Sequence, residues 1–186
     1  YLEIMTEIEK VITSLTLHGG SNPSEKGFCD EIVAWIERYR EFAFLKDNLD
    51  GHITASMMIT NPEHTRVLLM LHKKLRMWVQ FWGHCDGEID TLSVAIREFH
   101  EESGISIEPN LVWGIFHVDI HEIPQYKTTP KHKHYDIMYL GEISDTIEFA
   151  RQEAEVDDIR WFDIDGIENT LWEKWTVSRI EKIKTL

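Results

Sequence analysis

Apolar residues recur every three to four positions in two stretches near the start of the chain, 2–17 and 24–45. This period matches one face of an α-helix, so both stretches are predicted to be amphipathic helices. We expect the segment Gly19-Gly20-Ser21-Asn22-Pro23-Ser24 to end the first helix and Ser24 to cap the second. From residue 53 the pattern changes to short apolar runs typical of strands, at 53–60, 66–72 and 77–82. The pattern predicts a helical N-terminal extension, residues 1–49, before an α+β domain, residues 50–186.

The remainder of the chain alternates between the two patterns. A helical period runs over 90–103 and 167–184, and strand-like runs occupy 111–120, 135–143 and 159–164. Between them, Ile123 to His134 contains two prolines and several lysines and histidines. This composition favours a mobile surface loop.

Charge narrows the classes of function. Against 19 Lys and Arg stand 33 Asp and Glu, a net charge of −14 with an isoelectric point near 5.1. Such a surface repels a phosphodiester backbone, which argues against a nucleic-acid polymer as partner. No apolar run approaches the roughly 18 residues of a membrane span, and the first ten residues do not resemble a secretory leader. We expect a soluble, cytoplasmic protein with no membrane partner and with Cys29 and Cys85 as reduced thiols.

Three carboxylates gather on the predicted helix 90–103. Glu98, Glu101 and Glu102 are spaced by three and four, so they share one patch of its surface. Like charges at this spacing destabilise a helix by a few tenths of a kcal/mol, and the macrodipole disfavours anions in the last turn. A bound divalent cation would compensate; a solvated acidic face is the alternative. Gly104 is placed to end the helix in a left-handed conformation.

These residues resemble a known family. The pattern G-x5-E-x7-R-E-U-x-E-E-x-G-U, where U is a bulky apolar residue, is the Nudix box. It is matched here by Gly83, Arg97, Glu98, Phe99, Glu101, Glu102, Gly104 and Ile105. The first glutamate of the box is replaced by Ile89. The preceding residues are similar to a bacterial Nudix subgroup that reads W-x-Q-P-G-G-H-x-D-G-D-x-D, with Phe81 and Trp82 in place of Pro-Gly.

The resemblance implies a Nudix-type α/β/α sandwich with a mixed sheet. It also implies a Mg²⁺-dependent pyrophosphohydrolase, with Mn²⁺ as an alternative ion, acting on a small nucleoside diphosphate linked to another group. Glu98 and Glu102 would bind the metal, Glu101 would be a ligand or orient the attacking water, and the Gly83 carbonyl would complete the shell. Arg97 would orient a glutamate, and Glu155 is a candidate general base on a late loop.

Three residues are candidates for contact with the substrate: His84, His134 and Trp82. His134 lies in a segment rich in histidine and lysine, which suits phosphate contacts or a transition metal, although a polar surface loop is the simpler interpretation. Two rival functions stay open. One is a Nudix-fold nucleotide-binding module without catalysis, and the other is an isomerase resembling isopentenyl diphosphate isomerase, in which Cys85 would act. The helical extension either covers its own domain or pairs with a second copy to form a homodimer.

Overall fold

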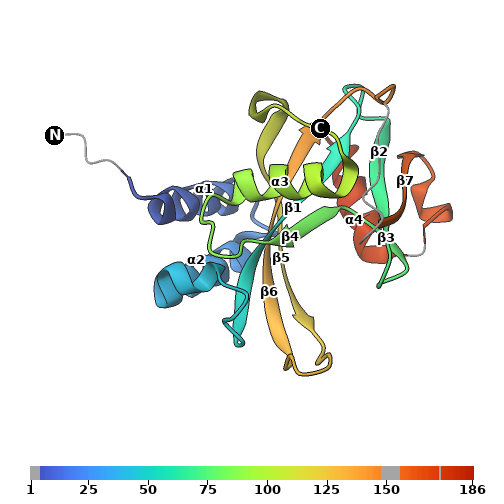
Figure 1. Ribbon diagram of the computed structural model, residues 1–186. Helices are drawn as coiled ribbons and strands as arrows, with labels where there is room; N and C mark the ends of the chain where they lie inside the picture. Colours follow the sequence, from blue (N-terminus) through green and yellow to red (C-terminus); the bar gives the residue numbers. More distant parts are fainter. Residues whose placement is uncertain (1–4, 148–155, 172) are drawn as a thin grey trace. The chain divides into compact units, whose positions relative to one another are not determined.

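The computed structural model describes residues 5–147, 156–171 and 173–186 (Figure 1). Its helices are α1 (Glu7–Ser21), α2 (Lys26–Tyr39), α3 (Thr91–Ser103) and α4 (Lys174–Ile183). Its strands are β1 (Gly51–Thr60), β2 (Arg66–His72), β3 (Met77–Val79), β4 (Phe81–His84), β5 (Val112–Ile123), β6 (His132–Glu142) and β7 (Val156–Asp163). The predicted α+β class is confirmed. None of the described helices is long and apolar enough to cross a lipid bilayer.

The described strands form one hydrogen-bonded sheet. Its order is β3-β2-β1-β6-β5, with β4 paired to β1 and β7 paired to β2. By contacts the chain divides into two compact units: the first contains residues up to 55, 83–94 and 114–138, and the second contains 56–82, 95–113 and the residues from 139 onward. Each unit combines several separate segments of the chain, so this division does not test the predicted boundary between an extension, residues 1–49, and a domain, residues 50–186. That boundary remains a prediction.

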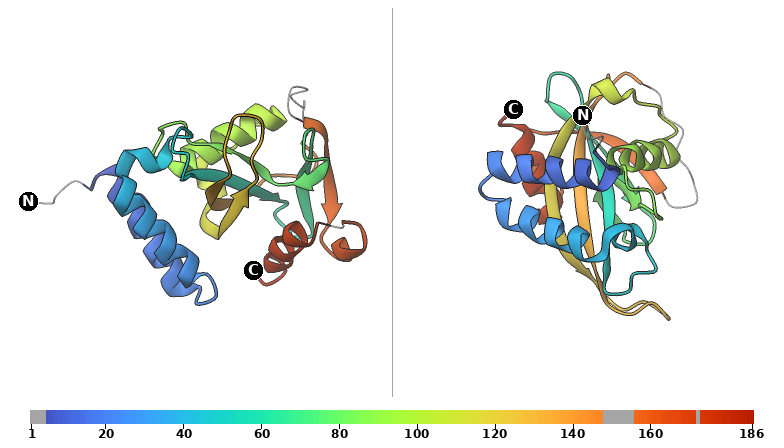
Figure 2. Two further views of the ribbon diagram at one scale, coloured as in Figure 1. Left: turned by 90° about the horizontal axis from the view of Figure 1, so that it is seen from below. Right: turned by 90° about the vertical axis from the view of Figure 1, so that its left-hand side faces the viewer.

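In the first unit, α1 and α2 lie side by side and cross the strands β5 and β6 (Figure 2, right). Helix α1 begins with a capping box, in which the Thr6 hydroxyl accepts from the Glu9 N–H and the Glu9 carboxylate accepts from the Thr6 N–H. Helix α2 contacts β6 through Trp35, which stacks on Tyr135 with ring centroids 4.5 Å apart. The helical extension is therefore packed on the sheet.

Helix α1 ends at Ser21, within the segment from Gly19 to Ser24 that was predicted to stop it. Gly19 itself lies inside the helix and allows close packing on α2: a Cβ there would lie 3.0 Å from the Cys29 Cβ. Ser24 does not cap α2; Glu25 occupies the N-cap position, and no side chain caps the helix there. The Glu25 side chain is instead buried against other elements.

In the second unit, β2 lies between β3 and β7. Its central residues, Val67 to Met70, are fully buried, and β7 pairs with it antiparallel from Arg66↔Asp163 to Leu71↔Asp158. Helix α4 is attached to β3 by the Thr176 hydroxyl, which donates to the Trp78 carbonyl at 3.2 Å. This unit also holds α3 from Ala95 to its end at Ser103.

Three further boundaries differ from the predictions. The apolar run 77–82 is two strands separated at Gln80. The C-terminal helix is shorter than predicted, because a single helical turn at Ile167–Asn169 precedes α4. The predicted loop Ile123 to His134 is shorter than expected: residues 124–131 connect the two strands, whereas β5 continues to Ile123 and β6 already begins at His132.

Candidate active site

Both ends of α3 are fixed by local hydrogen bonds. At the N-terminal end, the Asp90 carboxylate accepts from the Ser93 N–H at 3.2 Å and from the Ser93 hydroxyl at 2.8 Å. At the other end, Gly104 has φ of +73° and its N–H donates to the His100 carbonyl at 2.8 Å. The left-handed conformation predicted for Gly104 is confirmed. These contacts fix the helical positions of the three glutamates.

Arg97 contacts two of the three glutamates. Its Nη1 atom donates to Glu98 Oε1 at 2.7 Å and lies 3.5 Å from Glu101 Oε1. Burial lowers the pKa of the Arg97 guanidinium, but the charges and hydrogen bonds of both glutamates outweigh it, so the pKa is raised overall. The Glu98 side chain is 15% exposed and that of Glu101 is 56% exposed. The positive charge of Arg97 thus reduces the electrostatic repulsion between the Glu98 and Glu101 carboxylates.

Glu102 is the buried member of the cluster. The residue is 5% exposed, and its Oε2 atom accepts a hydrogen bond from the backbone N–H of Trp82 at 3.0 Å. A buried carboxylate is unfavourable without a counter-charge or hydrogen bonds. Since the donor is a main-chain group of β4, the position of this carboxylate is set by the sheet.

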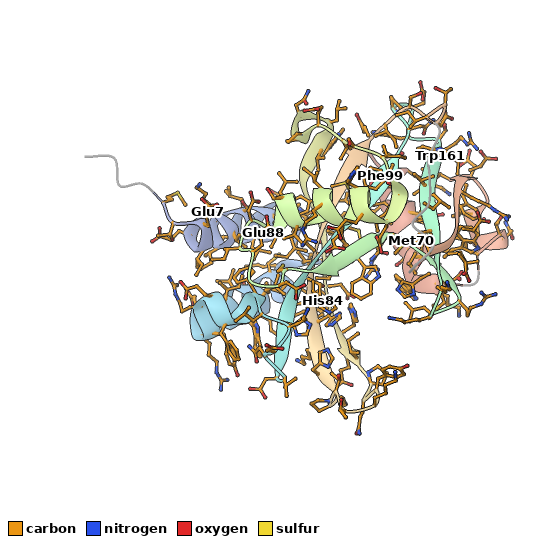
Figure 3. The ribbon with its side chains drawn as sticks, viewed as in Figure 1. Glu7, Met70, His84, Glu88, Phe99 and Trp161 are labelled. Atoms are coloured by element: carbon orange, nitrogen blue, oxygen red, sulfur yellow. The ribbon has the colours of Figure 1, made fainter. Side chains whose placement is uncertain are left out.

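Phe81 has a structural role that the sequence left undefined. Its ring is fully buried and packs edge-to-face on Phe99 of α3, with centroids 4.9 Å apart. Figure 3 shows Phe99 on the helix face turned toward β4. The residue that replaces proline in the subgroup pattern therefore joins β4 to the helix that carries the glutamates. Trp82 is half-buried beside His72, with ring centroids 6.2 Å apart.

The turn before α3 belongs to the first unit. Gly83 lies within β4. Gly87 follows in the turn with φ of +95°, a conformation that favours glycine, and its N–H donates to the Phe44 carbonyl at 3.0 Å. An ion pair of 3.0 Å between Lys46 and Asp86 also links this turn to the N-terminal segment.

His84 and His134 belong to a group of histidines in the first unit. The His134 ring centroid lies 4.8 to 5.5 Å from those of His52, His84, His121 and His132. Figure 3 shows His84 at the end of β4, near β1 and β6. Burial, with the neighbouring histidines, lowers the pKa of His52 to about 4 and that of His134 to about 2. Both imidazoles are therefore neutral at neutral pH.

The structure thus brings the predicted residues into separate groups. Within the second unit, Arg97 joins Glu98 and Glu101, and Trp82 holds Glu102. Within the first unit, His84 lies 5.3 Å from His134 between ring centroids. Glu155 lies outside the described residues.

Comparison with known proteins identifies the family. The sequence profile of the NUDIX domain matches residues 50–181. The chain belongs to the Nudix hydrolase family. A curated Nudix-type relative, the probable DHNTP pyrophosphohydrolase of Lactococcus lactis subsp. cremoris, is 29% identical over 119 residues. That alignment covers 63% of this chain and 66% of the relative, so just under two thirds of the relative is matched.

Solved structures confirm the predicted Nudix-type sandwich. The dihydroneopterin triphosphate pyrophosphohydrolase of E. coli superposes with a TM-score of 0.57 at 15% identity, covering 70% of this chain and 92% of that one. The MutT protein of Methanosarcina mazei Go1 gives a TM-score of 0.58 at 17% identity, covering 73% and 94%. The NUDIX domain of Shewanella oneidensis NrtR, solved with ADP ribose, gives 0.51 at 15% identity, covering 72% and 86%.

Sequence reasoning missed two residues of this Nudix chain that the structure makes prominent. His52 joins the histidine group, and its only sequence signal was its position at the start of a strand. Glu25 is 7% exposed and accepts hydrogen bonds from the Val118 N–H at 3.2 Å and from two histidines. Contacts between residues that are far apart in the chain leave no local pattern in the sequence.

Proposed function

We propose that the chain is a pyrophosphohydrolase that depends on Mg²⁺, or alternatively Mn²⁺, and cleaves a small nucleotide-like diphosphate. The observation that carries the proposal is the glutamate group of α3, within a domain of the Nudix family. Glu98 and Glu101 share the Arg97 guanidinium, and Glu102 is held from β4. A solvated acidic face would not need these contacts, since exposed carboxylates are hydrated by water.

The donor atoms suit a hard divalent cation. Glu98 and Glu102 would hold it with carboxylate oxygens, and the box position of Gly83 makes its carbonyl a further ligand. Burial of Glu102 supports this assignment, because a cation supplies the counter-charge that a buried carboxylate requires. When bound, the cation neutralises charge on the pyrophosphate and lowers the pKa of the attacking water.

The side chains around the carboxylates have separate tasks. Arg97 holds the Glu98 carboxylate in place and acts as a positioning residue. Glu101 is the most exposed of the three and accepts the proton of the attacking water, with Glu155 as the other candidate base. The water oxygen bonds to one phosphorus, the bridging P–O bond breaks, and the bridging oxygen leaves with the second phosphate.

Two kinds of compound named with the similar proteins support the proposed substrate class. Two of these proteins are named as pyrophosphohydrolases of dihydroneopterin triphosphate, one of them as a probable one, and the NrtR domain was solved with ADP ribose. Both compounds join a heterocycle to a phosphoanhydride. Trp82 and His84, both half-buried, are the proposed contacts to such a substrate. His134 is only 3% exposed, so it is less accessible to a substrate than His84, whose ring centroid lies 5.3 Å away.

The proposal is tested with a panel that contains dihydroneopterin triphosphate, ADP ribose and nucleoside triphosphates, each with Mg²⁺ or Mn²⁺ and with product identification. Glu98→Gln and Glu102→Gln should each lower turnover on the order of 10²-fold or more. Glu108→Gln, an exposed glutamate beyond the helix, is the matched control and should retain wild-type turnover. Full metal-dependent activity in both box variants would overturn the assignment.

A binding module without catalysis is the second candidate, favoured by Ile89 in place of the first box glutamate. Calorimetric titration with the same panel separates the two. Micromolar binding of a compound that is not hydrolysed with either metal would support the module. Multiple turnovers of any compound would support the enzyme. Cys85 is 1% exposed, which disfavours the isomerase alternative in which its thiol acts on substrate.

A further inference from the structure

Three histidines of the first unit offer nitrogen atoms to a common point. His52 comes from β1, and His132 and His134 come from β6. One ring nitrogen of each lies within 4.8 Å of one ring nitrogen of the others. His132 and His134 are two residues apart on a strand, so their side chains project from the same face. Residues 133 and 135 of β6 face α2, where Lys133 pairs with Glu31 and Tyr135 stacks on Trp35.

The hydrogen bonds of two rings select one tautomer. His52 Nδ1 lies 3.4 Å from the Asn48 carbonyl, and His132 Nδ1 lies 2.9 Å from the Pro130 carbonyl. A carbonyl oxygen only accepts, so Nδ1 carries the proton in both rings and each Nε2 presents a lone pair. An imidazole that donates one N–H to a backbone carbonyl and presents its other nitrogen has the arrangement of metal-binding histidines in proteins.

The surroundings support a ligand at this point. His52 Nε2 is buried and has no hydrogen-bond partner among the residues that the structure describes. Buried polar atoms are normally paired, so this atom requires an explanation. His132 also borders a pocket of about 360 Å³, whose charged lining residues are Asp50, Glu122, Lys131 and Lys133.

We propose that His52, His132 and His134 bind a transition-metal dication of the zinc class. Imidazole nitrogen suits Zn²⁺ and its neighbours in the first transition row better than it suits Mg²⁺, which prefers oxygen. In a tetrahedral site with Zn–N bonds of about 2.0–2.1 Å, ligand nitrogens are about 3.3 Å apart. Small side-chain rotations would bring the three nitrogens from their present separation to that distance. Three protein ligands leave a fourth position for water or another group.

The metal alone is the probe. The full, tag-free chain, freed of metal with a chelator, is titrated with Zn²⁺ by calorimetry in millimolar Mg²⁺, which occupies carboxylate sites. We expect one Zn²⁺ per chain, and a Co²⁺ complex with the visible absorption of a tetrahedral site. His52→Gln and His132→Gln should each weaken Zn²⁺ binding at least about tenfold. His64→Gln, a histidine paired with Glu142 in the second unit, is the control and should bind as the wild type does.

Several outcomes would overturn the proposal. These are no Zn²⁺ binding in the presence of Mg²⁺, equal binding by wild type and both histidine variants, or loss of Zn²⁺ binding in Glu98→Gln instead. His132 is the first residue of β6 and 9% exposed, so its variant should fold even if the His52 variant does not. Circular dichroism of each variant, recorded without metal, shows whether a lost site reflects lost structure.

Discussion

Replacing Glu25 with alanine should destabilise the first unit, because this buried carboxylate connects three elements. From the start of α2 it lies 2.7 Å from His18 Nε2 in α1 and 3.0 Å from His117 Nδ1 in β5. It also accepts from the backbone N–H of Val118 at 3.2 Å.

The size of the effect follows from these contacts. A buried N–H left without its acceptor costs about 1–3 kcal/mol. Three donors, two imidazole nitrogens and one backbone N–H, lose their acceptor together in Glu25→Ala. We therefore expect the free energy of unfolding to fall by about 3–5 kcal/mol in this variant. Glu25→Gln should lose only about 1–2 kcal/mol, because the amide oxygen still accepts from Val118 and the amide N–H₂ donates to a histidine nitrogen.

Urea denaturation followed by circular dichroism and tryptophan fluorescence measures these differences, with the slope m checked for constancy. Glu31→Gln is the matched control: it lies on the same helix and pairs with Lys133 of β6 at 3.0 Å, but both side chains are more than 40% exposed. Such a pair contributes less than about 1 kcal/mol. If the free energy of unfolding of Glu25→Ala lies within about 1 kcal/mol of the wild-type value, the energy assigned to the Glu25 contacts is wrong.

Three further substitutions test individual contacts. Gly104→Ala places a Cβ at φ of +73° and should cost about 1–2 kcal/mol in urea unfolding; an unchanged midpoint would show that the helix end relaxes. Phe81→Ala removes a ring buried against Phe99 and should cost about 3–5 kcal/mol, whereas a loss below 1 kcal/mol would contradict its packing role. Trp82→Ala keeps the N–H that holds Glu102, so it should raise KM about three- to tenfold with little change in kcat; the reverse would argue against a substrate contact.

Elements with a strong local signal were predicted well from the sequence. Helix α3 was expected over 90–103 and occupies Thr91–Ser103, because its apolar period ends at a glycine that adopts a left-handed conformation. Strand β2 has the predicted bounds, since its apolar run is flanked by polar residues. The family, and the helix that carries the glutamates, followed from the same local spacing.

Features that depend on distant residues were not predicted. The proposed zinc ligands within the histidine group combine one residue from β1 with two from β6, and sheet order makes these two strands neighbours. The Lys and His content of 123–134 indicated a loop, and residues 124–131 do connect β5 to β6, but pairing with β5 and β1 extends β6 back to His132. The packing of Gly19 against Cys29 of α2 likewise depends on a contact between two helices that a local pattern does not contain.

The hydrogen bond from the main chain at position 82 to Glu102 has a consequence for sequence variation. Every amino acid except proline has this N–H, so position 82 can accept a tryptophan here and a glycine in the similar subgroup without losing the bond. Proline one position earlier, as in that subgroup, does not remove the donor. The side chain at 82 can therefore diverge with the substrate while the carboxylate of Glu102 keeps its place.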